Sequence, residues 1–135
     1  LGVAQMEELL EFIRRKNCNY DLYRKVLDGF DGGTLLEFRA GTFSNKWFYS
    51  FKINRNKILA PMKEVIAALA ERGIQTRPVW GLIHEQVPYR QETTYQLEKA
   101  PYYAERILNL PCSTQITQDE IHYVGEQIQV VFSNI

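Results

Sequence analysis

The sequence has little that points to a metal, a membrane or a nucleic acid. Its 135 residues hold two cysteines and two histidines, scattered along the chain, so neither a disulfide framework nor a closely spaced set of metal ligands is present. Lys plus Arg total 16 and Asp plus Glu total 16, which leaves no basic excess for nucleic acid or anionic lipid. No apolar run approaches the roughly 20 residues that span a bilayer, and no secretory signal precedes the first helix. We therefore expect a cytoplasmic protein.

The motifs of several common enzyme classes are also missing. The chain has no glycine-rich phosphate loop, no dinucleotide fingerprint, no nucleophile elbow and no zinc-binding helix motif. A cysteine–histidine nucleophile pair stays open at this level, because such pairs meet only in the folded chain. We predict no metal-binding residue.

The chain has the size and composition of one folded domain. Hydrophobic residues make up 45% of it, enough to bury a core within 135 residues. It starts at Leu1 without an initiator Met, and Val3, Met6 and Leu10 follow at helical spacing with no N-cap before them. We expect a piece of a longer protein that exposes apolar surface when isolated. The alternative is that the numbering begins after a processed or disordered start.

Periodicity and turn residues predict an α+β fold, or α/β by looser usage, with a small antiparallel or mixed sheet flanked by helices. The predicted segments are helices at 1–17, 20–27, 61–72 and 101–108, a last helix from Thr117, strands at 34–39, 46–53 and 74–80, a long loop at 81–94 and a short extended piece at 110–113. In the strand at 46–53, Trp47, Tyr49, Phe51 and Ile53 alternate with other residues, which predicts one buried face.

The last helix carries the clearest local signals. Thr117 and Glu120 form a capping box, T-x-x-E. An apolar stripe at helical spacing follows, made of Ile121, Val124, Ile128 and Val131. We expect His122 to be exposed on this helix and Cys112, just before it, to be a small buried hydrophobe.

Between two regular elements the chain gathers polar and aromatic side chains that suit a small-molecule site. Arg77 can grip phosphate or carboxylate with its planar fork of donors. Trp80 and Tyr89 can stack on a flat ring or a sugar face. His84 and Gln86 can hydrogen-bond hydroxyls or phosphate oxygens. This chemistry predicts a site for a phosphorylated, ring-bearing molecule, and the alternative is a solvated loop with two anchoring aromatics.

An ordered set of motifs resembles the sugar-nucleotide aminotransferases of the DegT/DnrJ/StrS family. The segments that carry the resemblance are S-x-x-W at 44–47, G-I-x-T-R-P at 73–78, H-x-Q-x-x-Y at 84–89, A-E-R at 104–106, L-P-x-S at 110–113 and T-x-x-E-x-x-Y-V at 117–124. The opening at 1–5 also resembles the helix that links the two domains in that family. The sequence at 79–82 and 95–100 is most similar to that of members which aminate 4-keto-6-deoxy sugars on UDP, of the bacillosamine and legionaminic acid type.

The resemblance implies a small C-terminal domain of a fold-type I pyridoxal-phosphate enzyme. Residues 1–27 would link to a large domain that is missing here, and residues 28–135 would form the sheet and helices of the small domain. The large domain would hold pyridoxal phosphate and its Schiff-base lysine. None of the seven lysines matches the setting of that lysine, so we expect no catalytic or cofactor-binding residue in this chain and no transamination by it alone.

The resemblance also implies a function for the longer protein. It would be a homodimer that transfers an amino group, from glutamate, to a nucleotide-linked keto sugar used for surface polysaccharide or glycan biosynthesis. The substrate-binding residues would be Arg77, Trp80, His84, Gln86, Tyr89 and Asn45. Two alternatives remain at this stage: a free-standing, non-catalytic domain that binds a small molecule or a partner, and a degenerate copy that pairs with a separate large-domain subunit.

Overall fold

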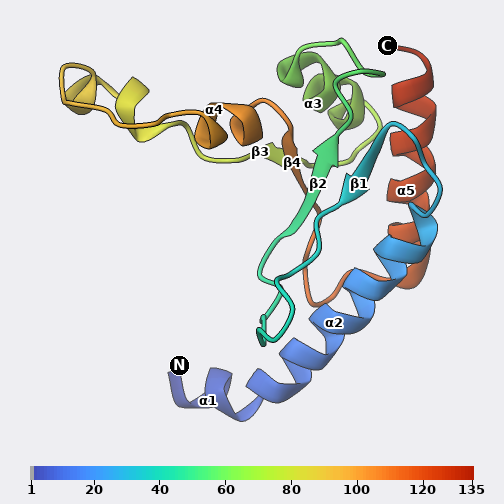
Figure 1. Cartoon of the computed structure of the whole chain (residues 1–135). Helices are drawn as coiled ribbons and strands as arrows, with labels where there is room; N and C mark the ends of the chain where they lie inside the picture. The colour runs from blue at the N-terminus through green and yellow to red at the C-terminus, as the bar shows by residue number, and fades with distance from the viewer. Residues whose placement is uncertain (1) are drawn as a thin grey trace.

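A computed structural model describes residues 2–135 and shows helices packed on a four-stranded sheet (Figure 1). Leu1, which we expected at the start of the first helix, lies outside the described residues. The helices are α1 (Gly2–Glu7), α2 (Leu9–Val26), α3 (Met62–Ala70), α4 (Lys99–Ala104) and α5 (Gln118–Ser133), with short 3-10 turns η1 (Ile83–Glu85) and η2 (Val87–Tyr89). The strands are β1 (Gly33–Leu35), β2 (Tyr49–Ile53), β3 (Arg77–Pro78) and β4 (Ile107–Leu110).

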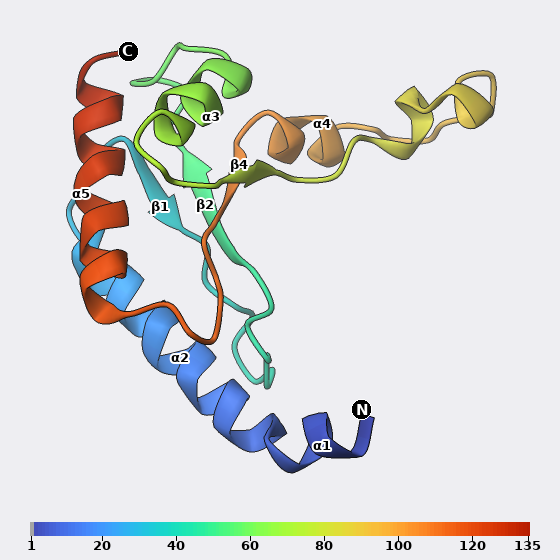
Figure 2. The ribbon, with the colours of Figure 1, turned by 180° about the vertical axis from the view of Figure 1, so that it is seen from behind.

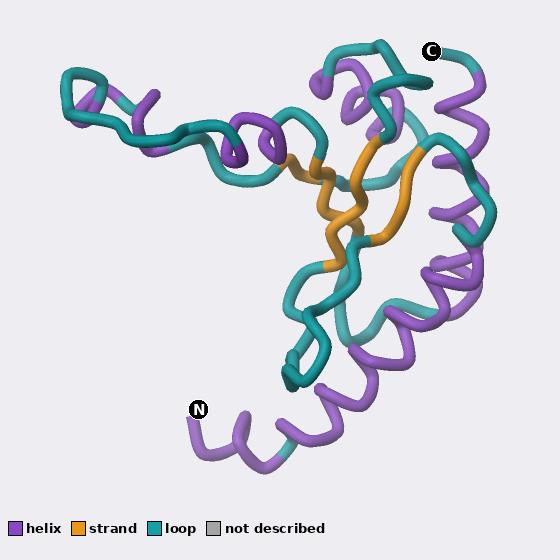
Figure 3. The backbone as a smooth tube through the Cα atoms, in the orientation of Figure 1, coloured by secondary structure: helices purple, strands orange, loops and turns teal. Residues whose placement is uncertain are grey.

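The sheet is antiparallel throughout and confirms the α+β prediction. Its strand order is β1-β2-β4-β3, so the two central strands come from distant parts of the sequence. Side chains alternate along β2, where Tyr49, Phe51 and Ile53 are buried while Ser50 and Lys52 point to the other face. Figures 2 and 3 show α2, α3 and α5 gathered on one side of the sheet, which leaves an open face. No helix within residues 2–135 has the length and apolarity to cross a bilayer.

Helix ends in this fold follow the local sequence signals. The Thr117 amide donates to the Glu120 carboxylate at 2.7 Å, and the Glu120 amide donates back to Thr117 Oγ1 at 3.2 Å, which confirms the capping box. At the end of α3, Gly73 has a φ of +77° and the Ile74 amide donates to the Leu69 carbonyl at 3.0 Å. Leu69 and Ile74 are both buried beside this turn, which completes the helix-ending motif typical of glycine.

Helix α2 is tied to one end of the sheet by side chains that reach backbone carbonyls. The hydroxyls of Tyr20 and Tyr23 donate to Leu36 O and Pro111 O, at 2.7 and 3.1 Å. Lys16 Nζ donates to the carbonyls of Trp47 and Cys112. Burial raises the pKa of Tyr23 well above its ordinary value, because the phenolate would lose its hydration. These contacts satisfy polar groups where three loops converge on the helix.

Two expected elements differ from the structure near the sheet. Trp47 was expected on the buried face of its strand but is 65% exposed, because β2 begins only at Tyr49. Ile107 and Leu108 were expected in a helix but form β4, where both are buried. The pairing of this segment with β2 over four residues decides its conformation, since local propensity is a weaker term than sheet pairing and burial.

The first helical region also differs from its expectation. It consists of the short α1 and one continuous α2, with the break at Glu8 rather than near residue 18. The predicted apolar face is present but uncovered, since Val3, Met6 and Leu10 are exposed. The buried face predicted for strand 46–53 is present from Tyr49 onward, where Tyr49, Phe51 and Ile53 pack in the chain's own core. The apolar stripe of α5 is buried and His122 is exposed, as expected, while Cys112 is half-buried against the core.

The capping box predicts a specific response to acid. Hydrogen bonds from the Thr117 amide and hydroxyl lower the pKa of Glu120. A lowered folded-state pKa means that the stabilisation is complete above the carboxylate's ordinary value of 4.5 and is lost as the pH falls through the lowered value. In urea unfolding between pH 6 and 3, we expect Glu120→Gln to flatten this loss, and Glu126→Gln on the same helix to leave it unchanged. If the free energy of unfolding falls equally with pH in the parent and both variants, the capping box is not the source of the acid sensitivity.

Candidate functional site

The candidate site centres on an arm, defined as residues 79–98, that joins β3 to α4. Two 3-10 turns give the arm its only regular structure. The Glu85 amide donates to Leu82 O at 3.0 Å, the Tyr89 amide donates to Gln86 O at 2.9 Å, and Arg90 Nε donates to Glu85 O at 2.7 Å. The hydrogen bonds that shape the two turns each join two residues of the arm itself. Its shape is therefore set locally and not by the core.

The arm extends away from the sheet and its helices (Figures 1 and 2). Large apolar side chains are exposed along it, among them Ile83, Val87 and Tyr95. A segment of this length that carries apolar side chains into water is typical of an interaction surface. The residues of the arm are thus available to a ligand or protein surface outside this domain.

Aromatic rings gather where the arm leaves the sheet. The Trp80 ring meets Phe48 edge-on, with ring centroids 5.3 Å apart, and lies 6.5 Å from the Trp47 ring. Trp47 stacks obliquely on Phe48 at 4.8 Å. Trp80 is 70% exposed in spite of these contacts. We name these three residues the aromatic cluster. It offers flat apolar area beside an open sheet face, as a ring-bearing ligand requires.

A polar row crosses the open face close to this cluster. Arg77 on β3 and Ser50 on β2 both pair with Asn109 on β4, so all three side chains emerge on the same face. Ser50 Oγ donates to Asn109 Oδ1 at 2.8 Å, and Asn109 is 8% exposed. This bond uses the amide oxygen and leaves the amide NH₂ group as a donor. Arg77 itself is exposed, so its guanidinium can meet an anion.

The structure divides the predicted binding residues into two groups. Arg77 and Trp80 lie at the root of the arm, and Asn45 lies in the neighbouring loop two residues from Trp47. His84, Gln86 and Tyr89 lie farther out, on or between the two 3-10 turns. His84 Nε2 lies 4.0 Å from the Glu85 carboxylate, and an exposed pair at this distance contributes little to stability. The arm residues thus present donors and rings outward rather than around a closed pocket of this chain.

Asn45 has a local role that the sequence analysis did not expect. Its Oδ1 accepts the Trp47 amide at 3.2 Å, and the Ser44 hydroxyl accepts the Lys46 amide at 3.0 Å. Lys46 has a φ of +49° at this bend. Asn45 therefore helps to shape the turn that presents Trp47, and only its amide NH₂ remains for a ligand.

The sequence analysis missed Trp47, Phe48 and Asn109 as members of this surface. Trp47 was assigned to the core from its alternation, although the aromatic density around it was itself a signal. Asn109 stands as a single polar residue inside the apolar run Ile107–Leu110, and that was the signal that could have found it. A group of three or more side chains suited to a metal ion does not occur among residues 2–135.

Comparison with known proteins decides the family. A model described as the DegT/DnrJ/EryC1/StrS aminotransferase family matches residues 1–129. The chain belongs to this family. The match covers the whole sheet, the arm and most of α5, so the family's sequence pattern includes every element described above.

Two curated proteins that the chain is similar to are considerably longer than the chain. EpsN of Bacillus subtilis (strain 168), described as a pyridoxal phosphate-dependent aminotransferase, is 26% identical over 139 residues. The GDP-perosamine synthase of Escherichia coli O157:H7 is 26% identical over 137 residues. These matches cover 100% and 99% of this chain but 35% of each relative. The chain therefore spans about a third of the relatives' length.

Solved structures of aminotransferases share the fold. The crystal structure of DesI in the presence of its TDP-sugar product superposes with a TM-score of 0.91 at 24% identity. It covers 98% of this chain and 34% of the DesI chain. At this identity the likeness establishes the fold, including the open sheet with its helices on one side.

Proposed function

We propose that the chain is the small domain of a pyridoxal-phosphate aminotransferase that acts on a nucleotide-linked keto sugar. The family match over residues 1–129 is the observation that carries this proposal. The curated relatives support it, since one is described as pyridoxal phosphate-dependent and another as a GDP-perosamine synthase, and each is nearly three times as long as the matched region.

The residues of this chain alone do not fit the cofactor. Pyridoxal phosphate needs a lysine that can form a Schiff base and a cradle for its phosphate. Lys16 is held by two backbone carbonyls, and Lys46 lies 4.0 Å from the centre of the Tyr20 ring. The other five lysines, Lys52 included, do not match the sequence setting of the family's Schiff-base lysine. We therefore propose that a large domain outside residues 1–135 holds the cofactor, and we expect this chain to be inactive by itself.

The arm and its root would bind the substrate. Arg77 would supply a guanidinium for the phosphate groups, and His84 would supply a second polar or phosphate contact. Trp80 with the rest of the aromatic cluster would stack on a ring, while Gln86 and Tyr89 would line the sugar pocket. Asn45 would contribute its amide NH₂ at the edge. Exposure of the arm in this chain supports a site completed by another protein surface.

The finer assignments follow from the family resemblance. We propose glutamate as the amino donor and a UDP-linked 4-keto-6-deoxy sugar as the acceptor, for polysaccharide or glycan biosynthesis in the cytoplasm. We also propose a homodimer, supported by the exposed apolar side chains of the arm and of Val3, Met6 and Leu10, which a second protein surface would cover.

The test starts with the intact protein, expressed from the native start codon of its gene and purified. We expect a mass well above 15.8 kDa, the absorbance of bound pyridoxal phosphate, and glutamate-dependent amination of a UDP-linked keto sugar. GDP- and TDP-linked keto sugars serve as matched alternatives for the nucleotide. The 135-residue chain assayed alone should give no product. A native product of 15.8 kDa would contradict the proposal and support a free-standing binding domain.

A further inference from the structure

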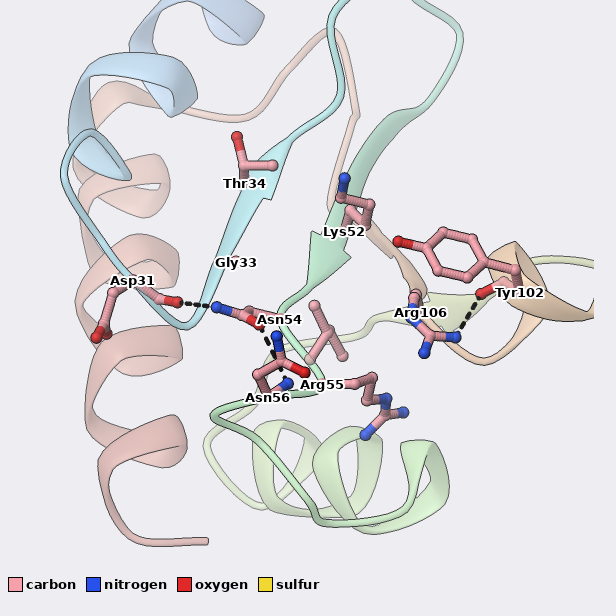
Figure 4. A pocket seen from close by; sticks show the side chains of 10 residues that line it. Asp31, Gly33, Thr34, Lys52, Asn54, Arg55, Asn56, Tyr102 and Arg106 are labelled. Atoms are coloured by element: carbon pink, nitrogen blue, oxygen red, sulfur yellow. Dashed lines mark hydrogen bonds between the residues drawn. The ribbon is translucent and has the colours of Figure 1, made fainter. Parts of the chain in front are cut away.

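A cavity of about 510 Å³ lies on the open sheet face, on the side of α4 (Figure 4). It is bounded by the start of β1, the end of β2, the loop that follows β2, and α4 with Arg106 just beyond it. Thr34 and Lys52 face each other in the β1–β2 register and form its floor. Tyr102 and Arg106 form one wall, and Asn56 contributes to another. None of the residues proposed for the sugar site lines this cavity.

The unpaired charge in this cavity is positive. Among residues 2–135, Lys52 Nζ has no hydrogen-bond or ion-pair partner. The one carboxylate in the lining, Asp31, pairs with Lys57 Nζ at 3.1 Å. Arg106 Nη1 donates to Tyr102 O at 3.0 Å and lies 3.3 Å from the exposed Glu105 carboxylate, which leaves Nε and Nη2 without such partners in the described chain. An anion entering here would meet two cationic groups.

The cavity holds its donors on fixed supports. The Arg106 guanidinium lies 4.0 Å from the centre of the Tyr102 ring, so each side chain positions the other. Figure 4 shows the Tyr102 hydroxyl directed toward Lys52, while Arg55 turns away toward α3. Arg55 instead donates through Nε and Nη2 to Glu105 O, at 3.0 and 2.6 Å, which fixes the end of α4 against the loop after β2.

We propose that this cavity binds the phosphate groups of a small molecule, between Lys52 Nζ, the Arg106 guanidinium and the Tyr102 hydroxyl. All three groups are donors, which matches the several acceptor oxygens of a phosphate. The volume exceeds that of one phosphate, so a diphosphate is accommodated. The phosphate can come from free pyrophosphate or from a nucleotide. The proposal is independent of the sugar site, because it uses neither the arm nor the cofactor.

The test uses calorimetric titration of the 135-residue chain, which closes its own core. Pyrophosphate, UDP and uridine are the three probes. We expect pyrophosphate and UDP to bind and uridine not to bind. Equal affinities would assign the site to the phosphates alone, and tighter UDP binding would assign it to a nucleotide. Amide chemical shifts of residues 52 and 99–106 should move in the same titration.

Variants separate a built site from diffuse surface charge. Lys52→Gln should weaken pyrophosphate binding about tenfold or more, since it removes a charged hydrogen bond. Tyr102→Phe, which keeps the ring for Arg106, should weaken it less. Lys63→Gln on the exposed side of α3 is the matched control and should leave the affinity unchanged. Absence of binding by pyrophosphate and UDP would overturn the proposal, and so would equal weakening by Lys52→Gln and Lys63→Gln.

Discussion

Replacing Gly125 by Val should strongly destabilise this domain. Gly125 is buried in α5 where that helix crosses α2, and a Cβ added there would lie 2.1 Å from Val26 Cγ1. Val26 is β-branched and stiff in its helix, so the clash must be relieved by separating the helices. We expect a loss of about 3 kcal/mol in the free energy of unfolding, measured by urea denaturation.

A second substitution makes this expectation specific to the helix crossing. Val26→Ala removes the methyl groups that Gly125→Val would meet, so the double variant should recover part of the lost stability. Gly81→Val is a matched control, because a Cβ at Gly81 has nothing within 4 Å and its backbone is not left-handed. Additive losses in the double variant, or an equal loss at Gly81, would contradict the close approach of α2 and α5.

Under the proposed function, shortening the arm should greatly slow amination while sparing the fold. Residues 82–97 contain no buried side chain, so replacing them with a short Gly-Ser linker removes no part of the core. We expect kcat/KM of the intact protein for its nucleotide-linked keto sugar to fall about 100-fold or more, because the substrate loses its positioning contacts. The melting temperature of the 135-residue chain should stay close to that of the parent.

If the intact protein is the proposed homodimer, mixed dimers would show which subunit the arm serves. A subunit with an inactivated Schiff-base lysine and an intact arm is combined with a subunit that has the lysine but the shortened arm. If the arm completes the partner's site, the mixture regains activity, since one site then has both parts. If the arm serves its own subunit, each site lacks one part and the mixture stays inactive. Full activity of the armless protein alone would contradict the role of the arm.

The sequence predicted best those parts of the fold that depend on neighbouring residues. The capping box at Thr117, the stop at Gly73 and the apolar stripe of α5 each depend on residues within a few positions, and all three are confirmed. The prediction of a helix at Ile107 and Leu108 was wrong, because the conformation of these residues is decided by pairing with β2. The prediction that Trp47 is buried was wrong for a related reason, since the alternating pattern does not show where strand pairing begins.

The candidate site was predictable as chemistry but not as geometry. Arg77, Trp80 and His84 were identified from the donors and rings they carry, and they stay proposals for substrate binding. That the arm leaves the core could not be seen, because exposed apolar residues such as Val87 look the same in sequence as buried ones. The cavity at Lys52 could not be predicted either. Thr34, Lys52 and Tyr102 are far apart in the sequence, and only the folded sheet with α4 beside it brings them together.

The strand order has a consequence for how fast this chain can fold. The central pair of the sheet joins Lys52 to Ile107, and α3, β3 and the whole arm lie in the chain between them. This long segment must close into a loop before β2 and β4 can form their hydrogen bonds. The chain therefore loses the conformational entropy of loop closure before the strand pairing contributes any stability. The arm lengthens this loop without contributing a core contact. Folding should therefore be slow for a domain of this size, with the helices forming well before the centre of the sheet.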